Sequence, residues 1–261
     1  MPLQEVSFPN GRVMVCSISN PESEGPNEDS AAVIQAPSGQ LLLIVADGVG
    51  GSRQGHIASK IAVDLMVEAV RAADPELTSL RALIIDSMEH SNQEILGLGT
   101  GAATTLMVAE IHEGQLRTYH AGDSTVLVCS SRGKTRLMTV GHNITERAVE
   151  AGWMDANEAI VHHERHLVSN ILGTPELRIE IGPRLALSPL DTVLVASDGL
   201  FDNLVPDEVI SRIRKEPLNQ NFEKLVKKTQ RMMTDGNGDR HGKPDDLTIL
   251  AWKRNRDSRA G

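Results

Sequence analysis

The sequence predicts an α+β fold built from largely antiparallel sheets. Two observations predict it: short apolar strands come in runs joined by hairpin-like turns, and amphipathic helices come in pairs. Strands and helices do not alternate strictly, which argues against a doubly wound parallel sheet. Neither an internal repeat nor a linker interrupts the chain, so we expect one domain over residues 1–253 and a frayed basic tail over residues 254–261.

The N-terminal part contains strands first and then helices. Apolar runs predict strands at residues 13–19, 31–36 and 40–47. Apolar residues at helical spacing then predict one helix between residues 52 and 73 and a second from residue 80 to residue 97.

The second part begins with a further run of short strands, at residues 103–111, 115–122, 124–131 and 135–140. The segment 141–180 is more polar and irregular, with one short helix predicted at residues 144–152. The chain then gives, in order, a strand at 191–199, helices at 206–215 and 221–233, and a last strand at 245–252.

Composition excludes several classes of partner. The chain carries 26 Lys and Arg against 35 Asp and Glu, a net charge of -9, and only 2% aromatic residues. A surface of this sign repels nucleic-acid phosphates, and few aromatic rings are available to stack on bases, so we expect no nucleic-acid partner. No apolar run approaches the ~18 residues of a membrane span, and the N-terminus has neither signal-peptide nor transit-peptide character. We therefore expect a cytoplasmic monomer with no membrane partner.

The two cysteines do not predict thiol chemistry. Cys16 and Cys129 lie in apolar runs and outside any CxxC or zinc-type spacing. We expect them to be buried small hydrophobic residues rather than catalytic thiols or a disulfide, which agrees with a reducing compartment.

Acidic residues recur where predicted strands begin or end. They are Glu28, Asp29, Asp47, Asp123, Asp198, Asp245 and Asp246. Each alone is also typical of an ordinary turn or a solvated loop. Together they can converge on one edge of a sheet sandwich, where carboxylates raise each other's pKa unless a cation compensates. Oxygen-only ligands favour Mg²⁺ or Mn²⁺ over zinc.

A glycine-rich phosphate loop is excluded as the meaning of the segment "DGVGGSRQG" at residues 47–55. The segment lacks the GxxxxGK[ST] pattern of a P-loop and the GxGxxG pattern of a dinucleotide-binding turn.

Six short segments in a fixed order carry a resemblance to a known family. They are "NEDS" (27–30), "ADGVGG" (46–51), "GTGAATTL" (99–106), "AGDS" (121–124), "SDGLFDN" (197–203) and "DDLT" (245–248). In this set and order the chain resembles the metal-dependent protein phosphatases, also called protein phosphatase 2C, in their bacterial single-domain form. The resemblance implies a four-layer αββα sandwich, in which two antiparallel sheets are flanked by helices.

The resemblance also implies a two-metal site. Asp47 would bridge two divalent ions, Mg²⁺ or Mn²⁺, and Gly48 would offer its carbonyl to one of them, with Glu28 nearby. Asp198 and Asp245 would bind the other ion, so that Asp47, Asp198 and Asp245 are the expected catalytic residues. A water shared by the two ions would attack phosphorus directly, without a phosphoenzyme.

A third ion, the substrate class and the partners follow from the same resemblance. Asp123 and Asp202, together with Asp198, match residues that hold a third, weaker metal ion. The implied reaction is hydrolysis of phosphoserine and phosphothreonine in proteins. The implied partners are a phosphoprotein substrate and a serine/threonine kinase or its target, in a signalling role.

The sequence departs from the family pattern at two positions. Where family members usually carry a phosphate-binding arginine, this chain has Glu24, which would repel phosphate. Arg53 is the candidate replacement and Arg240 a weaker one, although each is also typical of a surface arginine. Val49 stands where some members have a histidine that serves as general acid, so a metal-bound water would protonate the leaving group.

Several alternatives stay open. Segment 141–180 would be the variable flap of the family, and "HHERH" (162–166) in it is either a solvated stretch or, less favoured, a zinc site. Glu24 is the one feature that favours a catalytically weak pseudophosphatase that binds a phosphoprotein. A two-metal phosphoesterase acting on small molecules is the other alternative.

Overall fold

The strands form two antiparallel sheets, as predicted. The computed structural model describes residues 3–49, 54–155, 162, 168–235 and 242–254. The first sheet contains, in spatial order, β1 (Gln4–Phe8), β2 (Gly11–Ile18), β12 (Leu247–Lys253), β11 (Thr192–Ala196), β7 (Thr125–Cys129) and β8 (Thr135–Met138). The second contains β10 (Leu185–Ala186), β6 (Gln115–Ala121), β5 (Leu106–His112), β4 (Leu41–Asp47) and β3 (Asp29–Gln35), and β9 (Glu180–Ile181) also pairs with β6. All the pairings between these strands are antiparallel.

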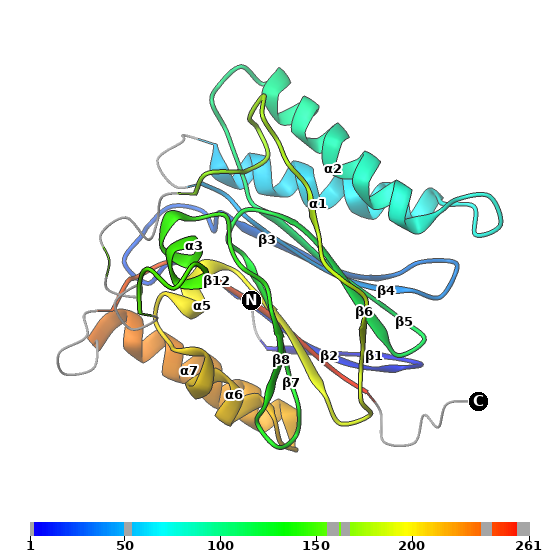
Figure 1. Ribbon diagram of the computed structural model, residues 1–261. Helices are drawn as coiled ribbons and strands as arrows, with labels where there is room; N and C mark the ends of the chain where they lie inside the picture. The colour runs from blue at the N-terminus through cyan, green and yellow to red at the C-terminus, as the bar shows by residue number, and fades with distance from the viewer. Residues whose placement is uncertain (1–2, 50–53, 156–161, 163–167, 236–241, 255–261) are drawn as a thin grey trace.

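The helices lie outside the two sheets (Figure 1). They are α1 (Gly55–Ala72), α2 (Leu80–Gly97), α3 (Ile144–Glu150), α5 (Asp198–Phe201), α6 (Pro206–Ile213) and α7 (Leu218–Asp235). In Figure 1, α1 and α2 cover one outer face, above β3 to β6, and α6 and α7 cover the opposite face. None of the helices in the described part of the chain is long and apolar enough to cross a membrane.

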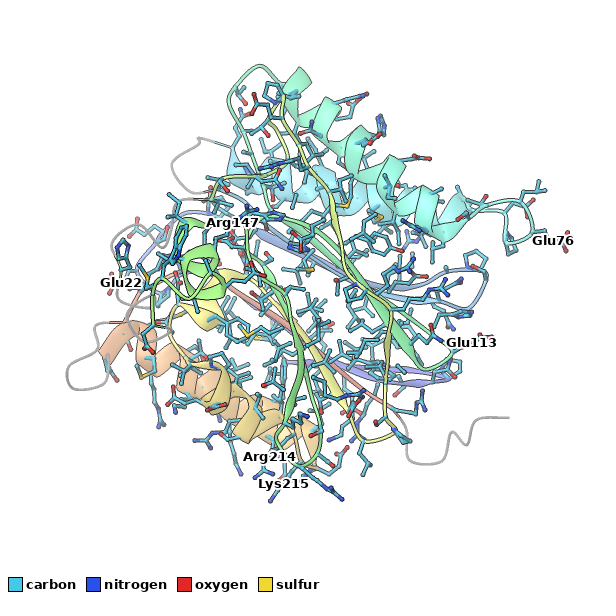
Figure 2. All side chains as sticks on the ribbon, in the orientation of Figure 1. Glu22, Glu76, Glu113, Arg147, Arg214 and Lys215 are labelled. Carbon is cyan, nitrogen blue, oxygen red and sulfur yellow. The ribbon has the colours of Figure 1, made fainter. Side chains whose placement is uncertain are left out.

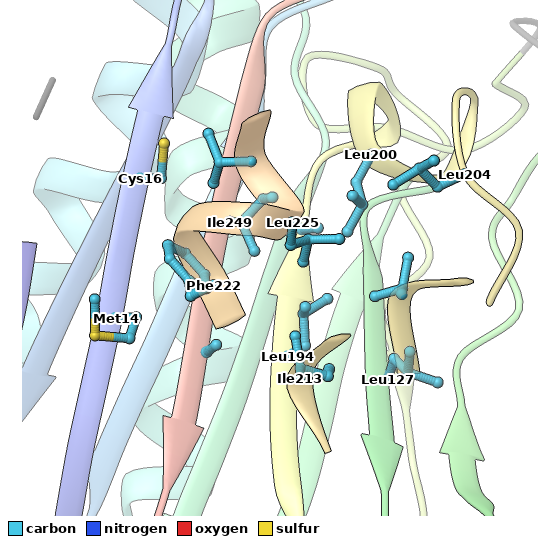
Figure 3. Close-up of a cluster of buried hydrophobic side chains, with 14 of the residues drawn as sticks. Met14, Cys16, Leu127, Leu194, Leu200, Leu204, Ile213, Phe222, Leu225 and Ile249 are labelled. Carbon is cyan, nitrogen blue, oxygen red and sulfur yellow. The ribbon is translucent and has the colours of Figure 1, made fainter. Parts of the chain in front are cut away.

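Three hydrophobic clusters separate the four layers. One cluster lies between the two sheets and includes Leu43, Val195 and Trp252. A second joins α1 and α2 to the second sheet. The third joins α5, α6 and α7 to the first sheet, and Figure 3 shows Phe222 and Leu225 of this cluster over the sheet. Alternate residues of the buried strands therefore face either the partner sheet or a helix layer, which confirms the αββα architecture.

Both cysteines are buried in the cluster beneath α7, as expected for small apolar residues. Figure 3 shows Cys16 on β2. Burial raises the pKa of each thiol to about 11, so neither is a thiolate at neutral pH.

Three strands and one helix were not predicted from the sequence. β1 is largely exposed and polar, and it is a strand because it pairs along its length with β2. The strands β9 and β10 have two residues each and depend on their pairing with β6. α5 is a single turn that follows β11. None of these elements has a hydrophobic period of its own, so local pattern does not reveal them.

Antiparallel order brings the acidic strand ends together. Because neighbours run in opposite directions, the end of β4 lies beside the start of β3, and the end of β11 lies beside the start of β12. Figure 1 shows α5, which follows β11, at the same end of the sandwich as α3.

Candidate metal centre

Asp47 lies at the C-terminal end of a fully buried strand, directly opposite another aspartate. Six apolar residues of β4 precede it, and all six are buried. In the antiparallel register, Asp29 at the start of β3 is its cross-strand partner. Neighbouring positions across a sheet hold their side chains close together, so two carboxylates share this edge.

Hydroxyl side chains of the "GTGAATTL" segment fix the backbone of Asp47. The Asp47 N–H donates to Thr105 Oγ1 at 3.0 Å, and Thr104 Oγ1 donates to the Asp47 carbonyl at 2.8 Å. The Thr105 N–H also donates to that carbonyl, at 2.8 Å. Gly122 packs against Thr105, where an added Cβ would lie 2.4 Å from the threonine Cβ. Two of the recognised segments therefore position the aspartate of a third.

Glu28 and Gly48 lie beside Asp47 in a close junction of three backbone segments. The Gly48 N–H donates to the Glu28 carbonyl at 3.1 Å. A Cβ on Gly48 would approach the Gly55 carbonyl carbon and oxygen at 2.4 Å, and one on Gly55 would approach Glu28 Oε1 at 2.9 Å. Only glycines allow the end of β4, the start of α1 and the Glu28 side chain to come this close.

Asp198, Asp202 and Asp245 form a second group of carboxylates. One oxygen from each lies within 4.8 Å of the others. The ammonium of Lys243 lies among them: Nζ donates to Asp198 Oδ2 at 2.9 Å and to Asp202 Oδ2 at 2.6 Å, and it is 3.0 Å from Asp245 Oδ2. The three carboxylates hold the pKa of Lys243 well above its usual range, although burial opposes this.

Asp29 is a buried residue in which only one of the two carboxylate oxygens accepts a hydrogen bond. Its Oδ2 accepts from Ser197 Oγ at 2.8 Å. Its Oδ1 is buried and has no hydrogen-bond partner among the described residues. Burial raises the pKa of Asp29 to about 8, the hydrogen bond from Ser197 and the nearby Thr248 hydroxyl oppose the rise, and Asp246 and Asp198 add to it. An unsatisfied buried carboxylate oxygen is costly unless a cation compensates.

The pKa values of three further carboxyl groups are raised. Burial is the main cause for Asp47, whose pKa lies well above its usual range, and Asp29, Asp198, Asp123 and Asp245 raise it further. Burial is again the first cause for Asp245 and for Glu28, and Lys243 and His56 respectively oppose it. Among the described residues, more carboxylate groups gather here than nearby cations offset.

The donor set fits hard divalent cations. Carboxylate oxygens and a backbone carbonyl are the ligands that Mg²⁺ and Mn²⁺ prefer, and the group around Asp47 offers no sulfur. A divalent cation bound here would partner the free oxygen of Asp29 and lower the raised pKa of Asp47.

Asp123 lies near Asp47 but outside the group that surrounds Lys243. It is buried, and it contributes to the raised pKa of Asp47. The oxygens that meet at the ammonium come from Asp198, Asp202 and Asp245. In the described residues, the expected ligands of a third ion, Asp123, Asp198 and Asp202, therefore do not form one group of neighbouring oxygens.

A histidine network positions the loop before Asp123. The Gly122 N–H donates to His142 Nδ1 at 3.1 Å, so this nitrogen carries no proton and Nε2–H donates to Glu180 at 3.0 Å. His120 stacks on His142 with ring centroids 4.7 Å apart, and burial lowers its pKa to about 4. To coordinate a metal through Nε2, His142 would have to move its ring proton to Nδ1, where it would meet the Gly122 N–H. We therefore assign this cluster to holding Gly122 in place.

The phosphate-contact candidates are not placed. Arg53 and Arg240 lie outside the described residues. Of the segment 162–166, for which a zinc site was considered, only His162 is described. Glu24, at the position of the usual arginine, is exposed in the loop between β2 and β3. Figure 2 shows Glu22 of the same loop at the edge of the molecule, on the side where α5 lies.

Sequence reasoning assigned no role to Lys243, and it named Asp246 only as one of the acidic residues at strand ends. In the structure Asp246 accepts the backbone N–H groups of Asn20 at 2.7 Å and of Glu28 at 2.6 Å. The one signal in the sequence was their position, within two residues of an expected metal ligand.

Comparison with known proteins agrees with this geometry. The family model described as protein phosphatase 2C matches residues 19–239. Protein phosphatase PhpP of Streptococcus pneumoniae is 30% identical over 198 residues, 73% of this chain and 80% of the relative. The serine/threonine phosphatase stp of Listeria innocua is 28% identical over 238 residues, 88% of this chain and 90% of the relative.

A solved structure shares the fold. The catalytic domain of the serine/threonine protein phosphatase PstP, in complex with two manganese ions, superposes with a TM-score of 0.76 at 20% identity. The match covers 94% of this chain and 98% of that one. Together, the matched model, the 30% identical relative and the carboxylate geometry show that the chain belongs to the protein phosphatase 2C family of metal-dependent protein serine/threonine phosphatases.

Proposed function

We propose that this phosphatase hydrolyses phosphoserine and phosphothreonine in proteins at a centre of two divalent ions, Mg²⁺ or Mn²⁺. Asp47, Asp198 and Asp245 would hold the ions, together with the Gly48 carbonyl and Glu28. The observation that carries the proposal is the half-buried Asp47, whose pKa four neighbouring aspartates raise in a site made of oxygen donors. When bound, the two ions supply an ionised water as nucleophile and offset the charge of the phosphoryl oxygens.

The protein's own residues contribute rigidity and charge. Thr104 and Thr105 hold the Asp47 backbone from both sides, so the carboxylate is fixed before any ligand binds. Ser197, adjacent to Asp198, donates to Asp29 and links the two sheets at the site. Preorganised donors and ligands avoid the cost of reorganisation during the reaction.

The proposed substrate is a phosphoprotein, either the target of a serine/threonine kinase or the kinase itself. Two observations support a phosphomonoester as the reacting group: membership of the family, and a site built from carboxylates that suit divalent ions. Lys243 already contacts three of the site aspartates. The proposed phosphate contact is Arg53, which follows Gly50 and Gly51 closely in the sequence.

Hydrolysis of a phosphothreonine peptide and of p-nitrophenyl phosphate tests the proposal. We expect activity with Mn²⁺ or Mg²⁺ and none with EDTA. Asp47→Asn should lower kcat by more than ~100-fold, which is the loss expected when a residue that only supports a metal ligand is removed. Asp64→Asn is the matched control, because Asp64 is exposed on α1 and pairs with Lys60 at 2.8 Å, on the surface of the helix.

Three outcomes separate the alternatives. Two bound ions without turnover of either substrate would favour the pseudophosphatase. Turnover of small phosphate esters but not of phosphopeptides would favour a small-molecule phosphoesterase. Equal activity of Asp47→Asn and the wild type would contradict the site itself.

A further inference from the structure

Lys243 places a permanent positive charge inside the carboxylate group. It lies in the segment that leads into β12, and its side chain is 25% exposed. Its Nζ contacts one oxygen each of Asp198, Asp202 and Asp245 at 2.9, 2.6 and 3.0 Å. The ammonium therefore lies beside Asp202, where a third cation would otherwise lie, and it contacts one oxygen each of Asp198 and Asp245.

The backbone of Lys243 is clamped as well as its side chain. The Lys243 N–H donates to Asn203 Oδ1 at 2.9 Å, and Asn203 Nδ2 donates to the Lys243 carbonyl at 2.9 Å. Asn203 is buried and follows Asp202 directly, so the clamp ties the lysine to the turn that carries one of its carboxylate partners. The next residue, Pro244, restricts the backbone of Lys243 further.

The ammonium is not arranged to bind phosphate. Two of its three N–H donors are hydrogen-bonded to Asp198 and Asp202, and the third carboxylate lies 3.0 Å from the nitrogen. A phosphate oxygen could reach Nζ only by displacing a carboxylate and would meet three negative charges there. The charge of Lys243 is therefore directed at the protein's own aspartates.

The Lys243 ammonium and a divalent ion cannot both bind the same oxygen of Asp202. A Mg²⁺ ion requires its oxygen ligands at about 2.1 Å and in octahedral order. Lys243 Nζ already lies 2.6 Å from Asp202 Oδ2, and Asp123, the other expected ligand of a third ion, lies outside the group. Resting on the proposed two-metal function, we propose that Lys243 replaces the third divalent ion and that this phosphatase binds two ions per chain.

Counting bound Mn²⁺ tests this proposal independently of activity. The free ion gives a six-line paramagnetic resonance signal, so bound ions are counted by its loss as Mn²⁺ is titrated into the metal-free full chain. We expect two ions per chain in the wild type up to millimolar Mn²⁺. Lys243→Gln and Lys243→Ala should each bind a third ion with a dissociation constant of about 10⁻³ M, the range of weak cation sites.

Two variants serve as controls. Lys243→Arg keeps the charge and should keep the count of two. Lys228→Gln removes a lysine of similar exposure, 30%, that pairs with Glu208 at 2.7 Å on α6, and it should also keep the count of two. Thermal melts check that each variant is folded.

Activity provides a second readout. At Mn²⁺ concentrations that fill only the two tight sites, Lys243→Gln should be about tenfold slower than the wild type, in line with the loss of a group that orients metal ligands. Millimolar Mn²⁺ should restore its rate, whereas the wild type and Lys228→Gln should already be saturated.

The possible results distinguish this inference from the function on which it rests. A wild type that binds three ions, or a Lys243→Gln variant that binds two, overturns the replacement of an ion by lysine while leaving the phosphatase intact. A wild type that binds no ion overturns the proposed function and the inference with it. If the neutral variants do not fold, the wild-type and Lys243→Arg counts still decide between two ions and three.

Discussion

Asp246 shows how one residue next to a metal ligand can serve the site without binding metal. Its two carboxylate oxygens accept from Asn20 N–H at 2.7 Å and from Glu28 N–H at 2.6 Å. These bonds join the loop before β3 to the start of β12, across 218 to 226 positions of sequence. Hydrogen bonds to an ionised acceptor are among the stronger ones in proteins.

We expect Asp246→Ala to lower both stability and metal affinity. Two half-buried backbone donors would lose their acceptor, which costs about 1–3 kcal/mol each in the worst case. Because Glu28 would no longer be anchored, Mn²⁺ affinity should fall by about 10- to 100-fold. Urea unfolding and the Mn²⁺ titration measure the two effects.

Asp74→Ala is the matched control for Asp246. Asp74 also accepts a backbone N–H, from Glu76 at 2.9 Å, but it is exposed in a loop far along the chain from the site ligands. It should change the free energy of unfolding by less than about 1 kcal/mol and leave metal affinity unaltered. Unchanged Mn²⁺ affinity in Asp246→Ala would show that the Glu28 loop is positioned by other contacts.

At the scale of elements, the junction of β4 with α1 decides where the proposed metal ligands Asp47 and Gly48 lie. Gly48 follows Asp47 immediately, and its missing side chain lets Gly55 at the start of α1 approach. The Glu28 carbonyl would lie 2.8 Å from a Cβ on Gly48. A strand end, a helix start and a loop therefore meet at one small residue.

Gly48→Ala should therefore disrupt the site more than its size suggests. The added methyl group would meet backbone atoms at 2.4 Å, which cannot move as a flexible side chain could. We expect a loss of about 1–3 kcal/mol in the free energy of unfolding, the usual effect of overpacking, and a marked fall in kcat.

Gly97→Ala provides the comparison at the end of α2. No atom lies within 4 Å of a Cβ there, so the change should be neutral or slightly stabilising, with normal activity. If Gly48→Ala kept wild-type stability and kcat, the close approach of β4 and α1 would not be required for the site.

At the scale of the whole molecule, the site sets how stability depends on pH. The pKa of Asp29 is raised to about 8, and those of Asp47, Glu28 and Asp245 are raised above their usual values. Between about pH 4 and pH 8 the folded state therefore binds more protons at these groups than the unfolded state does. Stability must then fall as pH rises through this window.

We expect the melting temperature of metal-free protein to decrease from pH 5 to pH 8. The raised pKa of Lys243 lowers stability with rising pH only above the ordinary lysine pKa. Between pH 5 and pH 8 its contribution to stability is therefore constant. Saturating Mn²⁺ should flatten the dependence and raise the melting temperature most at pH 8, because the ions bind the deprotonated carboxylates. Scanning calorimetry in EDTA and in Mn²⁺ measures both curves, and a metal-free protein that gains stability toward pH 8 would contradict the carboxylate assignment.

The sequence by itself determined most of the elements and the identity of the acidic residues. Apolar runs such as residues 41–46 and the helical spacing of residues 80–97 are local patterns, so strands and helices follow from them directly. Asp47, Asp198 and Asp245 belong to a larger set of acidic residues at strand ends or starts, and the resemblance to the family selected them from that set. The exposed strand β1 could not be found in this way, because only its pairing with β2 defines it.

The tertiary structure alone decided which charges face each other. Lys243 is two residues from Asp245 in sequence but also contacts Asp198 and Asp202, 45 and 41 positions away. Asp29 becomes the neighbour of Asp47 through strand register, and Asp246 reaches the Glu28 loop through the order of strands in two sheets. Periodicity specifies which residues are buried along one element, whereas electrostatic interaction depends on distances between elements, and these exist only once the layers have packed.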